Sequence, residues 1–367
     1  MKINKLAVFV CCFSVTAIAS ADLEERVSAL ENQASLQALE NNLSLGGYGE
    51  FHYTRKGGNS YGDYHRVVLY AGYQFSDSIR LNSEIELEHS KTQDGGSNDY
   101  GYVLLEQFNV GIDLSETTTV VLGRSLAPMG IVGPRHEPPL FFGVERPNVE
   151  KYILPSTWSV DGVGLIGDLS ENISYEVHAV GGLDASGFTT TGGIRGGRQA
   201  AYQGLEKPSI TGRVDYYGID GLRVGASMWS GSSDFGKKGA DVGDGTEVSI
   251  SSLDFEYEAG ALSVNGLWAS GEHDGNGNAG TVAASEFDGN YLTVGYEILR
   301  DGEKALVPFV RISEYQTHDT VDAIKGTQFG ANYYLTDQFV LKADLLTEEQ
   351  GSSETDTFSL GFGMMFQ

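Results

Sequence analysis

Cysteine is nearly absent from this 367-residue chain, which contains only Cys11 and Cys12. Both lie in an N-terminal segment with the parts of a secretory signal: two lysines, an apolar core over residues 6–19 and a small-residue cleavage site ending at Ala21. We therefore predict a signal peptide at residues 1–21. Its removal leaves a mature chain without cysteine, which excludes disulfides and thiol chemistry.

Positive charge and long apolar runs are also scarce. The chain has 24 Lys and Arg residues against 50 Asp and Glu residues, a net charge of −26. Nucleic-acid binding requires a basic surface, so this balance excludes nucleic acid as a partner. The longest apolar run is the one in the predicted signal. It is too short for a spanning helix, which excludes a helical membrane protein.

Proline is rare and unevenly placed, because six of the eight prolines fall between residues 126 and 158. Proline cannot donate a hydrogen bond to a β-ladder, so this stretch is predicted to be a loop. Apolar side chains such as Ile131, Phe141 and Trp158 are interleaved with charges of both signs, and this composition argues against disorder. A loop of this length without secondary structure is usually functional.

The rest of the chain is rich in glycine and tyrosine and alternates with a period of two. In residues 79–88, apolar side chains share one face and charged side chains share the other. Short turns alternate strictly with longer connections, as in bacterial outer-membrane barrels. The short turns are predicted at 76–78, 115–117, 170–172, 218–221, 259–260, 300–303 and 335–338, and the longer connections include 55–63 and 350–355. The prediction is an all-β fold: a 16-stranded antiparallel transmembrane β-barrel over residues 43–367. The loop at about 126–158 then becomes the third external loop, which we expect to fold into the lumen and constrict it.

Residues 22–42 form the one convincing helical pattern. Leu23, Val27, Leu30 and Ala34 repeat at heptad spacing among acidic residues. A short N-terminal periplasmic coiled-coil helix in a homotrimer is the favoured interpretation, and an amphipathic helix on the barrel rim is the alternative.

Three stretches resemble a known family. They are RHEPPLFFGVERP at 135–147, ILPSTW at 153–158 and DGVG at 161–164. On these the chain resembles the phosphate-selective porin O/P-like group of trimeric 16-stranded outer-membrane porins. The resemblance implies an anion channel lined by arginine and lysine. The lumen positions of this chain lean acidic instead, which departs from that pattern.

Charged side chains on the barrel wall and on the loop are predicted to form the constriction of the pore. Fixed charges select ions by sign, and opposed charges orient polar solutes. The predicted wall side chains are Arg66, Arg80, Arg124 and Arg311. The predicted loop side chains facing them are Glu137, Glu145 and Glu150. In the alternative interpretation, these acids pair within the loop with Arg135 and Arg146 and only stabilise its shape.

Enzymatic signatures are missing. The seven histidines are scattered without zinc-type spacing, and the sequence contains no nucleophile elbow. We therefore expect no catalytic residue, no cofactor and no metal. The expected function is passive diffusion of ions and small hydrophilic solutes, with outer-membrane lipid and lipopolysaccharide around the barrel. The alternatives are a substrate-specific anion channel of the phosphate type, or a barrel acting mainly as an adhesin or receptor.

Overall fold

The computed structural model describes residues 42–89, 101–198, 205, 207–233, 246–275 and 282–366. The predicted signal peptide at 1–21 lies outside these residues, as does all but the last residue of the helix predicted at 22–42. Among the described residues, no helix is both long and apolar enough to cross a membrane.

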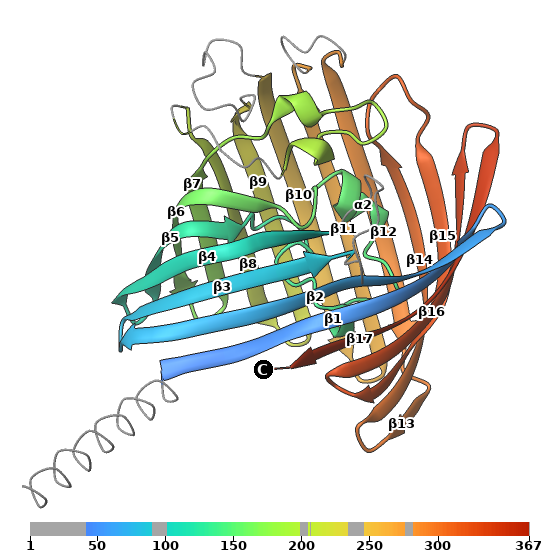
Figure 1. Ribbon diagram of the computed structural model, residues 1–367, viewed down its shortest axis with the longest axis horizontal. Helices are drawn as coiled ribbons and strands as arrows, with labels where there is room; N and C mark the ends of the chain where they lie inside the picture. The colour runs from blue at the N-terminus through green and yellow to red at the C-terminus, as the bar shows by residue number, and fades with distance from the viewer. Residues whose placement is uncertain are drawn as a thin grey trace, which may run out of the picture.

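One antiparallel sheet closes on itself to form the barrel in Figure 1. The first strand pairs with the last, from Gly47 opposite Phe366 to Lys56 opposite Thr357. The strands in chain order are β1 (Leu43–Lys56), β2 (Asn59–Ser76), β3 (Ile79–Glu88), β4 (Tyr102–Ser115), β5 (Thr118–Leu126), β6 (Ser159–Ser170), β7 (Ile173–Val180), β8 (Ser209–Ile219), β9 (Leu222–Ser233), β10 (Thr246–Ala259), β11 (Leu262–His273), β12 (Ser285–Tyr296), β13 (Leu299–Asp301), β14 (Lys304–Gln316), β15 (Ile324–Thr336), β16 (Phe339–Gln350) and β17 (Ser353–Phe366).

Seventeen strand segments make sixteen wall positions. Both β12 and the three-residue β13 pair with β14, so together they form one wall strand with a short interruption. The closed 16-stranded antiparallel barrel predicted from the alternation is therefore confirmed.

The alternating pattern places apolar side chains outside and polar ones inside. In β3, Glu84 and Glu86 are buried, whereas Ile85 and Leu87 are exposed on the outer surface. This is the reverse of a soluble sandwich and matches strands that contact lipid on one face.

Seven short turns join the strands at one end of the barrel, here called the short-turn end, at the predicted positions. Two connections at the opposite, long-loop end are shorter than expected. The loops predicted at 55–63 and 350–355 are two-residue turns, since the strands continue to Lys56 and Gln350. Gly57 and Gly58 both have positive φ, the conformation that such tight hairpins require.

Residues 127–158, here called the inner loop, connect β5 to β6 and carry η1 (Pro138–Leu140) and α2 (Asn148–Tyr152). Figure 1 shows α2 inside the ring of strands. A second connection, residues 181–208, carries η2 (Ala185–Gly187) and η3 (Arg195–Gly197) and packs beside it.

The main hydrophobic core lies inside the barrel, not between layers. Inner-loop side chains, residues of the 181–208 connection and inward side chains of β6, β7, β9 to β12 and β14 form one buried cluster. Trp158 of the inner loop packs on Trp229 of β9 with ring centroids 4.0 Å apart. Each fully buried large apolar side chain contributes roughly 1.5–3 kcal/mol, so this core attaches the inner loop to one side of the lumen.

Candidate channel constriction

Arg66 of β2 is predicted to face the pore, but it holds the inner loop. Its side chain is buried, with Nε 2.6 Å from Glu50 Oε1 and Nη1 donating to the Tyr48 hydroxyl. Its Nη2 donates to the carbonyl oxygen of His136 at 2.9 Å. A guanidinium whose donors are used in this way lends little charge to the lumen.

Arg311 of β14, also predicted to face the pore, has the same role on another part of the wall. It is buried, and its Nη2 donates to the Phe142 carbonyl at 2.9 Å. Lys342 of β16 donates to the Phe141 carbonyl at 3.0 Å, and Arg213 of β8 donates to the Gly130 carbonyl at 2.7 Å. These wall cations therefore bind the carbonyl groups that a loop without a ladder leaves unpaired.

Glu150, predicted to face the wall arginines, is fully buried inside the loop. Its Oε2 accepts the backbone amides of Ile131 and Val132 at 2.9 and 2.7 Å, and its Oε1 accepts the Tyr291 hydroxyl at 2.6 Å. Burial raises the pKa of this carboxyl, although the hydrogen bonds oppose that effect. Gly130, at φ 72°, precedes these amides, and a Cβ there would lie 2.5 Å from Oε2.

Arg124, the fourth predicted wall arginine, lies on the outer face of β5. Leu122, two residues earlier on the same face, is exposed, and so is Phe108, the cross-strand neighbour of Arg124. The guanidinium forms a bidentate pair with Asp161 of β6 at 2.6 and 2.7 Å. Its position excludes it from the constriction.

Arg80 does face the lumen. Its side chain is 38% exposed and pairs with Asp113 of β4 at 2.7 Å. Arg135 of the inner loop is 48% exposed and reaches across to Glu256 of β10. Both guanidinium groups thus lie in the open part of the interior, each beside a wall carboxylate.

The remaining predicted loop charges divide between the lumen and the packed interior. Glu145 is 40% exposed, with Oε1 3.1 Å from His52 Nδ1 and Oε2 3.8 Å from Lys151 Nζ. Glu137 is half-buried and accepts the Tyr70 hydroxyl at 3.1 Å. Arg146 is half-buried, and its Nη1 has no hydrogen-bond partner among the described residues. The ion pairs of the loop acids therefore involve neither the four predicted wall arginines nor Arg135 and Arg146.

His136 anchors the tip of the inner loop in a buried ionic cluster. Its Nε2 lies 3.4 Å from Glu84 Oε1 and 3.4 Å from Glu106 Oε2. The Thr157 hydroxyl donates to the other Glu106 oxygen at 3.0 Å. Burial alone would lower the pKa of His136, but the interactions with Glu106 and Glu84 outweigh burial and raise it to about 9.

Two arginines of the 181–208 connection complete the anchoring and were missed at the sequence level. Arg195 donates to the carbonyls of Lys151 and Ser156, both at 2.6 Å, and Arg198 donates to the Thr157 carbonyl at 3.1 Å. Burial, followed by the charge of Arg198, lowers the pKa of Arg195 to about 9. The signal for this anchoring role that the sequence offered was a pair of arginines three residues apart in a glycine-rich stretch.

Three cavities surround the inner loop. A cavity of about 310 Å³ and another of about 500 Å³ open toward the short-turn end, and one of about 400 Å³ opens toward the long-loop end. Each of the three is lined by more acidic than basic side chains. The charged lining residues are Glu256, Glu258, Glu297, Asp337 and Arg300 in the first, Glu84, Glu137, Glu176 and Arg80 in the second, and Glu145, Asp344, Glu348, Lys56 and Lys151 in the third.

Comparison with known proteins identifies one relative by sequence and several by fold. No family model matches the chain. An uncharacterized protein of Aquifex aeolicus (strain VF5) is 30% identical over 358 residues, covering 89% of this chain and 81% of the relative.

Solved structures similar to this chain are outer-membrane proteins. OmpF of Salmonella typhi in complex with daunomycin has a TM-score of 0.62 at 13% identity, covering 89% of this chain and 98% of that one. An anion-selective porin from Comamonas acidovorans has a TM-score of 0.58 at 13% identity, covering 88% and 99%. The trimer form of OmpT, an outer membrane protein of Vibrio cholerae, has a TM-score of 0.55 at 13% identity, covering 88% and 98%. At these identities the likeness shows a shared barrel fold.

Proposed function

We propose that this chain, which belongs to one family with the Aquifex aeolicus protein and has the barrel fold of outer-membrane porins, is a passive diffusion channel of the bacterial outer membrane. Its cargo is ions and small hydrophilic solutes. The observation that carries the proposal is the set of polar cavities on both sides of the inner loop, inside a wall with an apolar outer face. A sixteen-stranded barrel is wide enough for an aqueous path.

Acidic lining makes the channel cation-preferring. Each of the three cavities has more carboxylates than cationic side chains. Fixed negative charge in a confined lumen concentrates cations and repels anions.

The phosphate-selective alternative is weaker for the same reason. An anion pathway needs cationic side chains with free donors, and Arg66, Arg213, Arg311 and Lys342 donate to inner-loop carbonyls. Arg80 and Arg135 each lie beside a carboxylate. Our proposal therefore assigns the chain to diffusion without phosphate selectivity.

A homotrimer is part of the proposal. It is supported by the family resemblance in the sequence and by the trimer form of the similar OmpT structure. The barrel closes within one chain, so each subunit would carry its own channel.

Planar-bilayer recording tests the function. Folded protein, verified by heat-modifiable migration on gels, should produce conductance steps in groups of three. In a KCl gradient with EDTA present, the reversal potential should have the sign of cation preference. Folded protein that gives a closed record would overturn the channel and leave a binding barrel. A reversal potential of the opposite sign would overturn the cation preference alone.

A further inference from the structure

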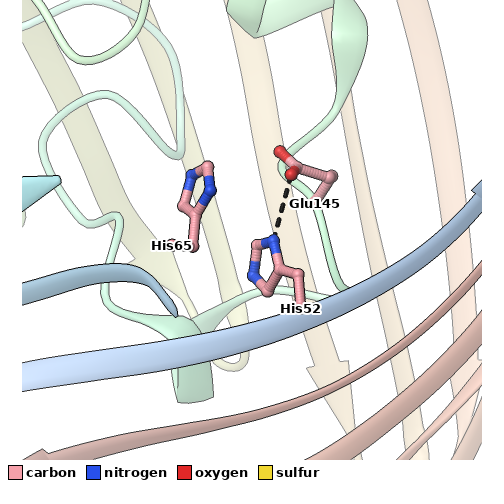
Figure 2. Close-up of side chains that lie close together, drawn as sticks. All are labelled: His52, His65 and Glu145. Atoms are coloured by element: carbon pink, nitrogen blue, oxygen red, sulfur yellow. Dashed lines mark hydrogen bonds and ion pairs between the residues drawn. The ribbon is translucent and has the colours of Figure 1, made fainter. Parts of the chain in front are cut away.

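Two wall histidines and one inner-loop carboxylate meet inside the barrel. Figure 2 shows His52 of β1, His65 of β2 and Glu145 of the inner loop converging from three segments. One imidazole nitrogen of each histidine and one oxygen of Glu145 lie within 4.8 Å of one another. These three ligand atoms are close enough to share one ion.

A β-bulge brings His65 into the group. Glu50 of β1 pairs with Arg66, and the next residue, Phe51, pairs with Tyr64, so His65 is the extra residue of β2. Tyr64 points outward and is strongly exposed. The ring of His65 instead stacks on that of His52, with centroids 4.5 Å apart and planes 15° from parallel. Bulges commonly redirect a side chain in this way at functional positions.

A further carboxylate lies close to a ring nitrogen of each histidine. Glu50 Oε2 lies 3.1 Å from His52 Nε2, on the opposite side of the ring from Nδ1, which faces Glu145. Asp63 Oδ2 lies 3.4 Å from His65 Nδ1. Metal-ligating histidines usually have a carboxylate or carbonyl on the second ring nitrogen, which fixes the tautomer and orients the ring.

Glu145 is 40% exposed and lines the cavity of about 400 Å³, which provides a path for an ion from the long-loop end.

We propose that His52, His65 and Glu145 form a site for a divalent transition-metal ion of the zinc class. Imidazole nitrogens and a carboxylate suit zinc, copper and nickel, whereas magnesium prefers all-oxygen ligands. The site is open to further ligands, because the cavity beside Glu145 leaves room for water. An ion there bridges the inner loop to β1 and β2.

The site also affects conduction if the chain is a channel, and this part of the inference rests on the proposed function. A bound dication cancels negative charge at Glu145 and ties the loop to the wall. Micromolar Zn²⁺ should therefore lower single-channel conductance reversibly, and EDTA should restore it.

Calorimetric titration of Zn²⁺ into the folded, EDTA-treated protein in detergent tests the site without requiring conduction. The parent should bind one Zn²⁺ per chain, and excess Mg²⁺ should not compete. His65→Gln and Glu145→Gln should each weaken Zn²⁺ binding more than about tenfold, which is the least expected even when only a hydrogen-bond partner of a ligand is changed. The matched control is His178→Gln, because His178 of β7 is a wall histidine outside this group that also pairs with a carboxylate, Glu176, at 2.6 Å.

X-ray absorption at the zinc edge supplies the second measurement. An imidazole shell at about 2.0–2.1 Å that loses one histidine in His65→Gln supports the site. Absence of Zn²⁺ binding by the parent, or equal binding by the parent and both site variants, overturns it. A parent that binds Zn²⁺ but gives no conductance steps would contradict the channel and leave the metal site standing.

Discussion

Arginines on the two faces of the barrel wall illustrate how position determines the role of one residue. Arg80 pairs with Asp113 in the lumen, and Arg124 pairs with Asp161 on the outer face. Both pairs are partly exposed, so neither adds much to stability. Only the lumen pair changes the field that a permeating ion meets.

We expect Arg80→Ala to make the channel more cation-preferring and Arg124→Ala to leave selectivity unchanged. Removing Arg80 leaves the carboxylate of Asp113 uncompensated in the lumen, whereas the outer pair lies across the wall. Reversal potentials in a KCl gradient measure both variants, with EDTA present. Equal shifts in the two variants would contradict the assignment of faces.

His136 links ionisation to the attachment of the inner loop. Its folded-state pKa of about 9 lies above the usual value of 6.5, so the charged form stabilises the folded protein. The shift corresponds to roughly 3 kcal/mol at most. This contribution is fully present below about pH 6.5 and is lost as the pH rises through about 9.

Thermal unfolding in detergent should therefore show a fall in stability between about pH 7 and 10 that depends on His136. The His136→Gln variant should be less stable at pH 6 and should lack this part of the fall, so parent and variant converge at high pH. A constant difference between the two across this pH range would show that the histidine is neutral in the folded state.

At the scale of the element, the inner loop behaves as a small core domain inside the lumen. It has little regular structure, so packing and side-chain hydrogen bonds replace the ladder. Trp158 contacts Trp229, and Glu150 joins the beginning of the loop to α2 and β12. Its shape therefore depends on a few buried contacts.

Truncation of one of these contacts should be costly. We expect Trp229→Ala to lower the free energy of unfolding by about 3–5 kcal/mol, the usual loss for a large aromatic removed from a core. Trp268→Ala is the matched control, because Trp268 of β11 is 47% exposed on the outer face. Denaturant titration in detergent compares the two. Equal losses of unfolding free energy in the two variants would mean that a tryptophan in the lumen core stabilises the protein no more than one on the outer face of the barrel.

At the scale of the whole molecule, the inner loop borders each of the three cavities described above. Leu140 lines the first, Glu137 the second and Glu145 the third, and all three belong to the stretch 135–146. Removing this stretch should join the cavities into one path.

A variant lacking residues 135–146, closed by a short glycine linker, should therefore conduct several times more current per step than the parent. The barrel wall closes through β1 and β17 without this stretch, so heat-modifiable migration should be retained. Parent-like conductance from a folded deletion variant would place the constriction elsewhere.

Local backbone rules explain what the sequence by itself determined. Alternation with a period of two, turn residues at regular spacing and six clustered prolines act within a few residues, so the barrel, its strand number and its long interrupting loop could be predicted. Strand ends were less certain, because polar strands beyond the apolar band resemble loops. For that reason two hairpins were taken for long connections.

Tertiary structure alone decided which charges meet. Arg66 holds a carbonyl seventy residues away, and the bulge that turns His65 toward His52 is invisible in the spacing of the histidines. Arg124 is separated by one glycine from three consecutive apolar residues, Val120 to Leu122, whose pattern fits either face of a strand. Register and loop path are global properties, because each depends on the closure of the whole barrel.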